Sequence, residues 1–150
     1  MSTATALRPQ PYRSGDLPDS IRVAFCSDSG ERLDGHFGSC RQFMIYQLCA
    51  REARLIELRE APPPLGPLKG EDNILRRVTL ISDCHLLYVL SIGGPAAARV
   101  INRGVHLLKP DGGSLQTQLD ALRQMLERGP PPWLARIVSA PITSYFEGSD

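Results

Sequence analysis

The residues best suited to chemistry stand in a glycine-rich stretch near the amino terminus, Asp34-Gly35-His36-Phe37-Gly38. A neutral imidazole is a common metal ligand, and a nearby carboxylate such as Asp34 can orient or polarise it. The glycines on either side of His36 let the backbone bend and let a bulky group approach closely. This pattern indicates a binding loop with His36 as its metal ligand. A histidine that makes only local hydrogen bonds is the alternative.

A second candidate is Gly93-Gly94-Pro95, where the sequence predicts the start of a helix. Two glycines before a proline expose backbone N–H groups, which bind anions at helix starts. Arg99, one turn later, would add a cationic donor. A tight turn without a ligand is the alternative. The pattern is neither GxGxxG nor a P-loop, so nucleotide binding gains little support.

The cysteines divide by their place along the chain. Cys26 closes the first predicted strand and Cys40 precedes the second, so both could lie at the His36 end of a sheet. Thiolates suit iron–sulfur chemistry, although a free cysteine is also a frequent small core residue. Cys84 and His85 precede the fourth predicted strand, so we expect them at the opposite end, away from His36.

The elements that must position these residues follow from the spacing of apolar side chains, in the order β-β-β-α-β-α-β-α. Strands are expected over residues 21–26, 43–48, 53–59, 86–92 and 105–109, and helices over residues 74–81, 95–103 and 115–128. Asp72 or Asn73 is available to cap the first helix and Ser114 to cap the third. Strands two and three should form a hairpin, whereas the later β/α units imply parallel strands with right-handed crossovers.

This order predicts the α/β class: a single ribonuclease-H-like domain with a mixed five-stranded sheet and helices on its faces. The domain should span residues 21–138, after a disordered tail over residues 1–20 and before a second tail over residues 139–150. A proline-rich connection occupies residues 61–70. Ligands of such sheets bind at the carboxyl ends of the parallel strands, where the loops holding His36 and Gly93 should meet.

Composition excludes several classes of function. The chain has 150 residues and a net charge of +1, so it lacks the basic excess of proteins that bind nucleic acid through phosphates. No apolar run is long enough to span a membrane, and the four cysteines include no CxxC pair. Reduced thiols in the cytoplasm are the simpler interpretation. Neither the close ligand pairs of structural zinc nor the clustered carboxylates of a two-metal nuclease are present.

Three segments together resemble one known family. They read VAFCSDSGERLDGHFGSCRQFMIY, SDCHLLYVLSIGGPAAARVINRGVHLLK and PPPWLARIV, occur in this order, and extend from about residue 21 to residue 138. The combination is similar to the dinitrogenase iron–molybdenum cofactor biosynthesis family, which comprises nitrogenase accessory proteins of the NifX, NifY and NafY type.

The resemblance implies a ribonuclease-H-like fold and a role without catalysis. Such proteins bind the iron–molybdenum cofactor, or its iron–sulfur precursor, and carry it between cofactor assembly proteins and apo-dinitrogenase. The family's HFG motif falls on His36-Phe37-Gly38, which makes His36 the expected cluster ligand, whereas Cys40 is no part of the family's pattern. The candidate cofactor-binding residues are Cys26, Asp34, Gly35, His36, Phe37, Gly38, Gly93, Gly94 and Arg99.

Two alternatives remain open. The protein could stabilise apo-dinitrogenase without carrying a cluster, or it could be a small metal- or redox-responsive protein that uses Cys26, His36 and Cys40.

Overall fold

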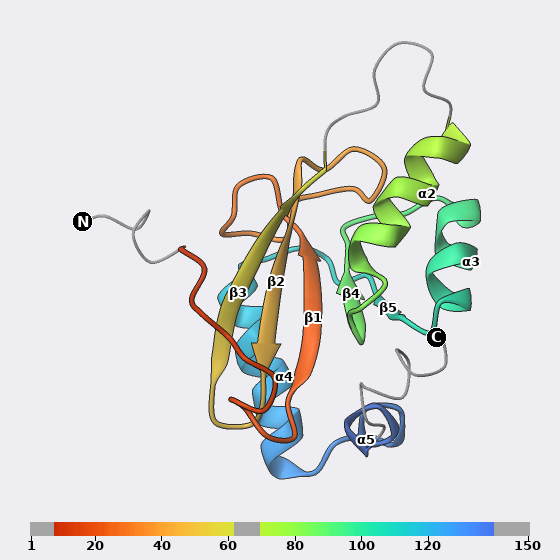
Figure 1. Ribbon diagram of the computed structural model, residues 1–150. Coiled ribbons are helices and arrows are strands. Elements are labelled where there is room, and N and C mark those ends of the chain that lie inside the picture. Colours follow the sequence, from red (N-terminus) through yellow and green to blue (C-terminus); the bar gives the residue numbers. More distant parts are fainter. Residues whose placement is uncertain (1–7, 62–69, 140–150) are drawn as a thin grey trace.

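The computed structural model, which describes residues 8–61 and 70–139, contains one mixed five-stranded sheet (Figure 1). Its strand order is β3-β2-β1-β4-β5. β2 is antiparallel to β1 and β3, whereas β1, β4 and β5 are parallel. The strands are β1 Ile21–Cys26, β2 Gln42–Leu48, β3 Ala53–Glu60, β4 Leu86–Tyr88 and β5 His106–Leu108. The predicted α/β class and mixed sheet are confirmed, while the closer likeness to ribonuclease H stays a prediction.

Helices cover both faces of the sheet because alternate strand residues are apolar on both sides (Figure 1). On one face, Ala24 and Cys26 of β1 pack with residues of α2 and α3. On the other face, Val23 and Phe25 pack with α4 and α5. The helices are α2 Gly70–Ile81, α3 Gly94–Asn102, α4 Leu115–Arg128 and α5 Pro132–Ser139. No helix of the described residues is long and apolar enough to cross a bilayer.

Of the two predicted helix caps, the structure confirms one and not the other. The side chain of Ser114 accepts a hydrogen bond from the Thr117 N–H, which confirms it as the cap of α4. The prediction for α2 is wrong, because the helix begins at Gly70 and places Asp72 and Asn73 inside its first turn. Asn73 instead donates a hydrogen bond to the Gly38 carbonyl at 3.0 Å.

The fourth strand is shorter than predicted, ending at Tyr88 instead of residue 92. Tyr88 pairs with Phe25, one residue before the end of β1, so hardly any of β1 is left for the residues after Tyr88 to join. They pair with a loop instead: the Leu90 N–H donates to the Gly35 carbonyl at 3.0 Å. This exchange of partners creates the candidate site described below.

The amino-terminal segment also differs from the expectation of a disordered tail. Residues 8–20 lie along the sheet, where the Gln10 N–H donates to the Leu55 carbonyl at 2.8 Å and Leu17 is buried. The reason is that β3 is an edge strand whose outer backbone groups are open to a partner. Residues 1–7, most of the proline-rich connection (62–69) and residues 140–150 of the second predicted tail lie outside the described residues.

The end of the sheet opposite the His36 loop is held by a buried histidine. The Arg22 N–H donates to His85 Nδ1 at 2.9 Å, and the His85 N–H donates to the Arg22 carbonyl at 2.7 Å. The Arg22 side chain bonds Asp83 at 2.9 Å. Burial, aided by the charge of Arg22, lowers the pKa of His85 to about 4. His85 is therefore neutral in the folded protein at neutral pH, where its Nδ1 accepts a hydrogen bond.

We expect His85 to make stability depend on pH. An unfolded histidine takes up its proton near pH ~6.5, whereas folded His85 does so only near 4, so acidification between these values favours the unfolded state. The wild-type free energy of unfolding should fall by about 2 kcal/mol more between neutral pH and pH ~4.5 than that of His85→Asn, whose amide oxygen replaces the acceptor without titrating. Urea denaturation of both proteins at several pH values measures this difference. An equal fall in the free energy of unfolding for the two proteins would contradict the prediction.

Candidate functional site

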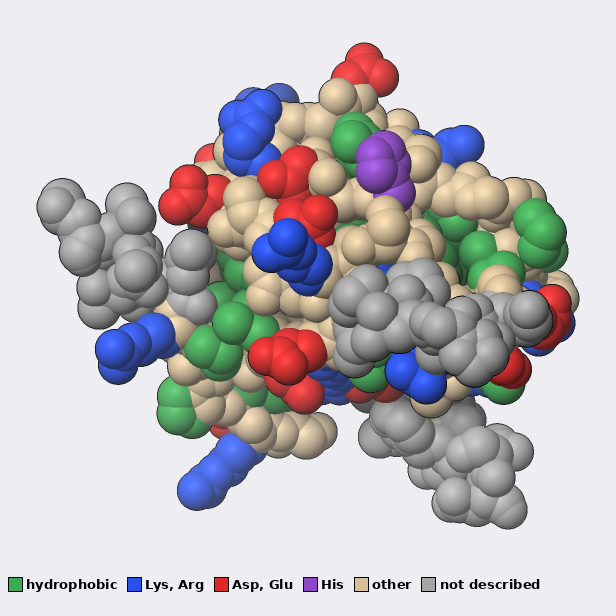
Figure 2. Space-filling model, turned by 90° about the horizontal axis from the view of Figure 1, so that it is seen from above, with side chains coloured by type: hydrophobic (Ala, Val, Ile, Leu, Met, Phe, Trp, Pro, Cys, Tyr) green, Lys and Arg blue, Asp and Glu red, His purple; other side chains and the backbone are tan. Residues whose placement is uncertain are grey.

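The predicted loop around His36 lies beside the segment that follows β4. His36 and Ser91 form a parallel β-bridge, and the Phe37 N–H donates to the Ser91 carbonyl at 2.9 Å. These residues lie at the end of the sheet where β1 and β4 have their carboxyl ends, which Figure 2 shows from above. The structure thus brings together the two loops that sequence analysis placed at one edge.

The His36 side chain is exposed and oriented by a hydrogen bond. Its Nδ1 lies 2.6 Å from Ser91 Oγ. With Nδ1 engaged by the serine, Nε2 is the ring nitrogen through which His36 would bind a metal. An oriented imidazole on an open surface can bind a large group that no small cavity would admit.

The orienting group is not the one that the sequence suggested. Asp34 Oδ1 accepts the Asp28 N–H at 2.8 Å, so this carboxylate stabilises the turn that precedes the histidine. Ser91 instead contacts the imidazole. Sequence analysis missed Ser91 because it lies 55 positions further along the chain. Its place just before the predicted Gly93-Gly94 loop was the available signal.

The two residues after His36 hold the loop in place. Phe37 is fully buried and packs against Phe43, with ring centroids 5.8 Å apart. Gly38 is exposed, and its carbonyl accepts the hydrogen bond from Asn73. In His36-Phe37-Gly38, the histidine therefore faces solvent while the phenylalanine ties the loop to the core.

The second predicted loop leads into α3. Gly93 and Gly94 are exposed, and Gly94 is the first residue of the helix. They follow Ser91 closely, so the amino end of α3 lies near His36 and offers backbone N–H groups to an anion. Arg99 is exposed and bonds Glu71 of α2, which partly offsets its charge.

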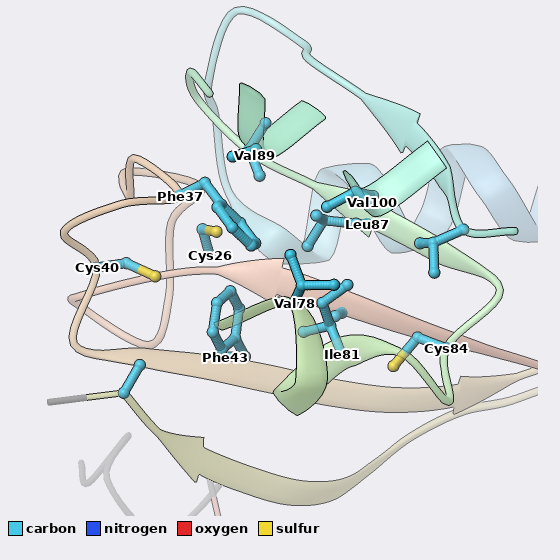
Figure 3. Close-up of a cluster of buried hydrophobic side chains, with 14 of the residues drawn as sticks. Cys26, Phe37, Cys40, Phe43, Val78, Ile81, Cys84, Leu87, Val89 and Val100 are labelled. Carbon is cyan, nitrogen blue, oxygen red and sulfur yellow. The ribbon is translucent and has the colours of Figure 1, made fainter. Parts of the chain in front are cut away.

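Beneath the exposed loop lie two thiols and a guanidinium. Cys26 and Cys40 are buried beside the rings of Phe37 and Phe43, whereas Cys84 lies at the far end of the same hydrophobic cluster (Figure 3). Arg77 of α2 is 1% exposed. It donates to the Cys40 carbonyl at 2.7 Å and to the Cys40 sulfur at 3.5 Å.

The two thiols differ in their tendency to ionise. Burial raises the pKa of Cys26 well above its ordinary value. The pKa of Cys40 is lowered, first by a hydrogen bond from the Cys26 thiol and then by the charge of Arg77. Cys40 therefore has the greater thiolate character of the pair.

Arg77 is the residue of this region that sequence analysis missed. Besides Cys40, it donates to the Phe37 carbonyl at 3.1 Å and to Asn73 Oδ1 at 2.9 Å. A signal was present, because Asn73, Arg77 and Ile81 recur every four residues, on the side of the predicted helix that also carries apolar residues. Polar residues on an apolar helix side indicate buried hydrogen bonding.

Gly35 lies where the loop passes closest to both cysteines. A methyl group there would lie 2.8 Å from Cys40 Cβ and 2.9 Å from the Cys26 carbonyl carbon. Because the second neighbour is backbone, it cannot move aside like the end of a flexible side chain. The position therefore requires a glycine.

We expect Gly35→Ala to destabilise the protein by about 2–3 kcal/mol, since the added methyl overpacks a rigid site. The matched control is Gly38→Ala, because a methyl at Gly38 has no neighbour within 4 Å and should change stability by less than about 0.5 kcal/mol. Midpoints of chemical denaturation measure both effects. Equal midpoints for the two variants would mean that the loop is not tightly packed.

Within the described residues, no three His, Cys, Asp or Glu side chains are grouped to hold a metal ion. In this part of the chain, a metal-containing group at His36 would thus depend on few protein ligands.

Comparison with known proteins gives the same family as the sequence motifs. The family model described as "Dinitrogenase iron-molybdenum cofactor" matches residues 19–125. The chain is 48% identical over 134 residues to protein NifY of Azotobacter vinelandii, covering 88% of this chain and 54% of NifY. It is 33% identical over 136 residues to protein NifX of Sinorhizobium fredii, covering 87% and 82% of the two chains. This chain thus spans about half the length of the first relative.

A solved structure shares the fold. The crystal structure of PH0822 matches 69% of this chain and 90% of its own length, with a TM-score of 0.54 at 18% identity. Since the family model covers more than half of the chain and the NifX match spans most of both proteins, this protein belongs to the dinitrogenase iron–molybdenum cofactor family.

Proposed function

We propose that this protein binds the iron–molybdenum cofactor, or its iron–sulfur precursor, and carries it between cofactor assembly proteins and apo-dinitrogenase. Membership of the family supports a role in nitrogenase cofactor biosynthesis. The observation that carries the proposal is the exposed His36 imidazole, oriented by Ser91 at 2.6 Å. In this proposal His36 ligates a metal of the cluster through Nε2, and the protein catalyses no reaction.

The geometry favours transfer over storage. A single histidine on an open loop leaves most of a cluster's surface accessible to the next protein, and one metal–ligand bond is easily exchanged. The name of the matching family model, which refers to the iron–molybdenum cofactor, supports this cargo role. A site with several protein ligands would release its cluster slowly.

The amino end of α3 supplies a complement to a negatively charged cargo. Gly93 and Gly94 offer backbone N–H groups at the positive end of the helix dipole, close to Ser91. Arg99 forms an ion pair with Glu71, so we expect it to attract the anionic cargo less than the backbone N–H groups do.

The test is direct binding without oxygen. Apo-protein is mixed with isolated iron–molybdenum cofactor and passed through a sizing column, and the protein fraction is analysed for iron and molybdenum. We expect both metals to elute with the protein and to pass to apo-dinitrogenase when it is added. A Cys84→Ala control should bind equally, because Cys84 lies at the opposite end of β4.

A protein fraction without metal would overturn carriage. If such a protein still forms a complex with apo-dinitrogenase, the alternative of a stabiliser without a cluster takes its place.

We expect Ser91→Ala to weaken cofactor binding by about tenfold, because loss of an orienting partner of a metal-bound histidine typically costs 10–100-fold. Ser39→Ala is the matched control, since Ser39 is an exposed serine of the same loop that meets His36 only through its backbone N–H. Anaerobic titration of isolated cofactor measures both affinities. Equal affinities in the two variants would show that the Ser91 hydroxyl does not orient the ligand.

A further inference from the structure

Cys26, Cys40 and Arg77 form a buried cluster that binding through His36 does not use; we call it the dithiol cluster. Cys26 is the last residue of β1 and Cys40 lies in the loop just before β2, and they are 0% and 1% exposed. A methyl group at Gly35 would lie 2.8 Å from Cys40 Cβ and 3.0 Å from Cys26 Cβ, so both cysteines approach the same point. The two thiols also influence each other's ionisation, since the neighbouring Cys26 side chain lowers the pKa of Cys40.

Arg77 places a positive charge against one of these sulfurs. Its guanidinium lies 3.5 Å from Cys40 Sγ, and its other bonds to the Phe37, Cys40 and Ala61 carbonyls hold it there. A neighbouring cation stabilises a thiolate, the form of cysteine that reacts as a nucleophile.

Cys84 provides a contrast within the same protein. It is also buried in this hydrophobic cluster, but its sulfur lies 3.6 Å from a carboxylate oxygen of Asp83. Burial first, and then the charge of this neighbouring anion, raises the pKa of Cys84 and so keeps its thiol protonated and unreactive. Two buried thiols of one core thus have neighbours of opposite charge.

We propose that Cys26 and Cys40 are a redox pair that hydrogen peroxide oxidises to a disulfide. The Cys40 thiolate attacks one peroxide oxygen, the O–O bond breaks, and hydroxide leaves to give a sulfenic acid at Cys40. The Cys26 sulfur then attacks the Cys40 sulfur, the S–O bond breaks, and the hydroxyl leaves as water with the Cys26 proton. The two sulfurs lose two electrons, and one peroxide becomes two waters once the first hydroxide is protonated.

The disulfide would close a ring that contains the candidate site. It joins the two ends of the 15-residue segment 26–40, within which His36 lies. The cysteine backbones already hold this segment: the Gly35 N–H donates to the Cys26 carbonyl at 3.1 Å, and the Cys40 N–H donates to the His36 carbonyl at 2.9 Å. Oxidation therefore changes the His36 loop. Formation of the disulfide does not depend on the proposed function. Only an effect of the disulfide on cofactor binding would rest on that function.

The experiment uses the full-length apo-protein, reduced and then exposed to hydrogen peroxide. Remaining thiols are alkylated in denaturant, and the protein is digested with trypsin, which cuts at Arg32 between the two cysteines. We expect a cross-linked pair of peptides, residues 23–32 and 33–41, lighter by two hydrogen atoms than the separate peptides and released by dithiothreitol. In the oxidised protein, the NMR signals of the His36 ring should shift.

Matched variants identify the pair. Cys26→Ser and Cys40→Ser should each abolish the cross-link, and Cys84→Ser should leave its rate unchanged. Alkylation of Cys84 should be as complete after peroxide as before. The inference is overturned if the wild-type protein accumulates Cys40 sulfinic acid without the cross-link, or if Cys84 is oxidised as fast as Cys40. Cofactor binding by the reduced protein is measured separately, so failure of either proposal is recognised independently.

Discussion

His36→Ala is expected to fold like the wild type and to lose affinity for isolated cofactor by at least about a hundredfold, or about 2.7 kcal/mol. The side chain is exposed, and its hydrogen bond is to the exposed Ser91, so its removal opens no cavity in the core. Asp34 Oδ1 already accepts the Asp28 N–H, so we do not expect this carboxylate to replace the metal bond. Anaerobic titration of cofactor, with circular dichroism to verify folding, measures both outcomes.

His106→Gln is the matched control for this prediction. His106 is a second partly exposed histidine, but it stacks on Trp133, with ring centroids 4.4 Å apart, in β5. If any accessible imidazole could bind the cofactor, both variants would lose affinity equally. We expect only His36→Ala to lose it, and retention of full affinity in His36→Ala would remove this residue from the site.

Acidification provides a second measure of the same bond. A proton and a metal compete for the same imidazole nitrogen, so wild-type affinity should decline when the solution is acidified. This decline should be absent from the residual binding of His36→Ala. Identical pH profiles for the two proteins would instead favour ligation by cysteine.

Much of the fold could be predicted because local pattern and burial agree. In Ile21–Cys26, Val23 and Phe25 alternate with Ala24 and Cys26, and the structure buries the two sets on opposite faces. Residues 8–20 could not be predicted in the same way, since the bond from the Gln10 N–H depends on the open edge of β3, far along the chain.

The candidate site was predictable only in part, for a similar reason. His36 is marked by neighbouring glycines, so its loop is visible in the sequence. The partner of its ring, Ser91, becomes adjacent only because the chain leaves the shortened β4 and pairs with that loop. No local pattern encodes a contact across 55 positions. The position of Arg77 on the apolar side of the predicted helix indicates burial, but its partners Phe37 and Cys40 become adjacent only when α2 packs on the sheet.

Arg77→Leu is expected to have the largest effect on stability, about 3–5 kcal/mol. The guanidinium donates hydrogen bonds to the carbonyls of Phe37, Cys40 and Ala61 at 3.1, 2.7 and 3.3 Å. A buried group left without its partner costs roughly 1–3 kcal/mol. The leucine avoids the penalty of burying a charge, which offsets part of this loss, yet removal of one side of a buried polar network is normally strongly destabilising.

The adjacent Arg76→Leu is the matched control, because Arg76 lies in the same helix but is exposed. It should change the free energy of unfolding by less than about 0.5 kcal/mol. Arg77→Lys should fall between the two, since an ammonium keeps the charge but cannot reproduce the planar set of donors. Urea denaturation of the three variants gives this order, and similar midpoints for Arg76→Leu and Arg77→Leu would contradict it.

Hydrogen exchange distinguishes a local effect of Arg77 from a general one. Arg77 bonds the carbonyls at both ends of residues 37–40, so its loss should release this segment before the sheet opens. In Arg77→Lys, which we expect to remain folded, the Cys40 N–H should exchange faster than in the wild type, while amides in the centre of β1 change less. Uniform acceleration of both would mean that Arg77 supports the core as a whole. Selective acceleration at Cys40 would show that α2 controls the loop that presents His36.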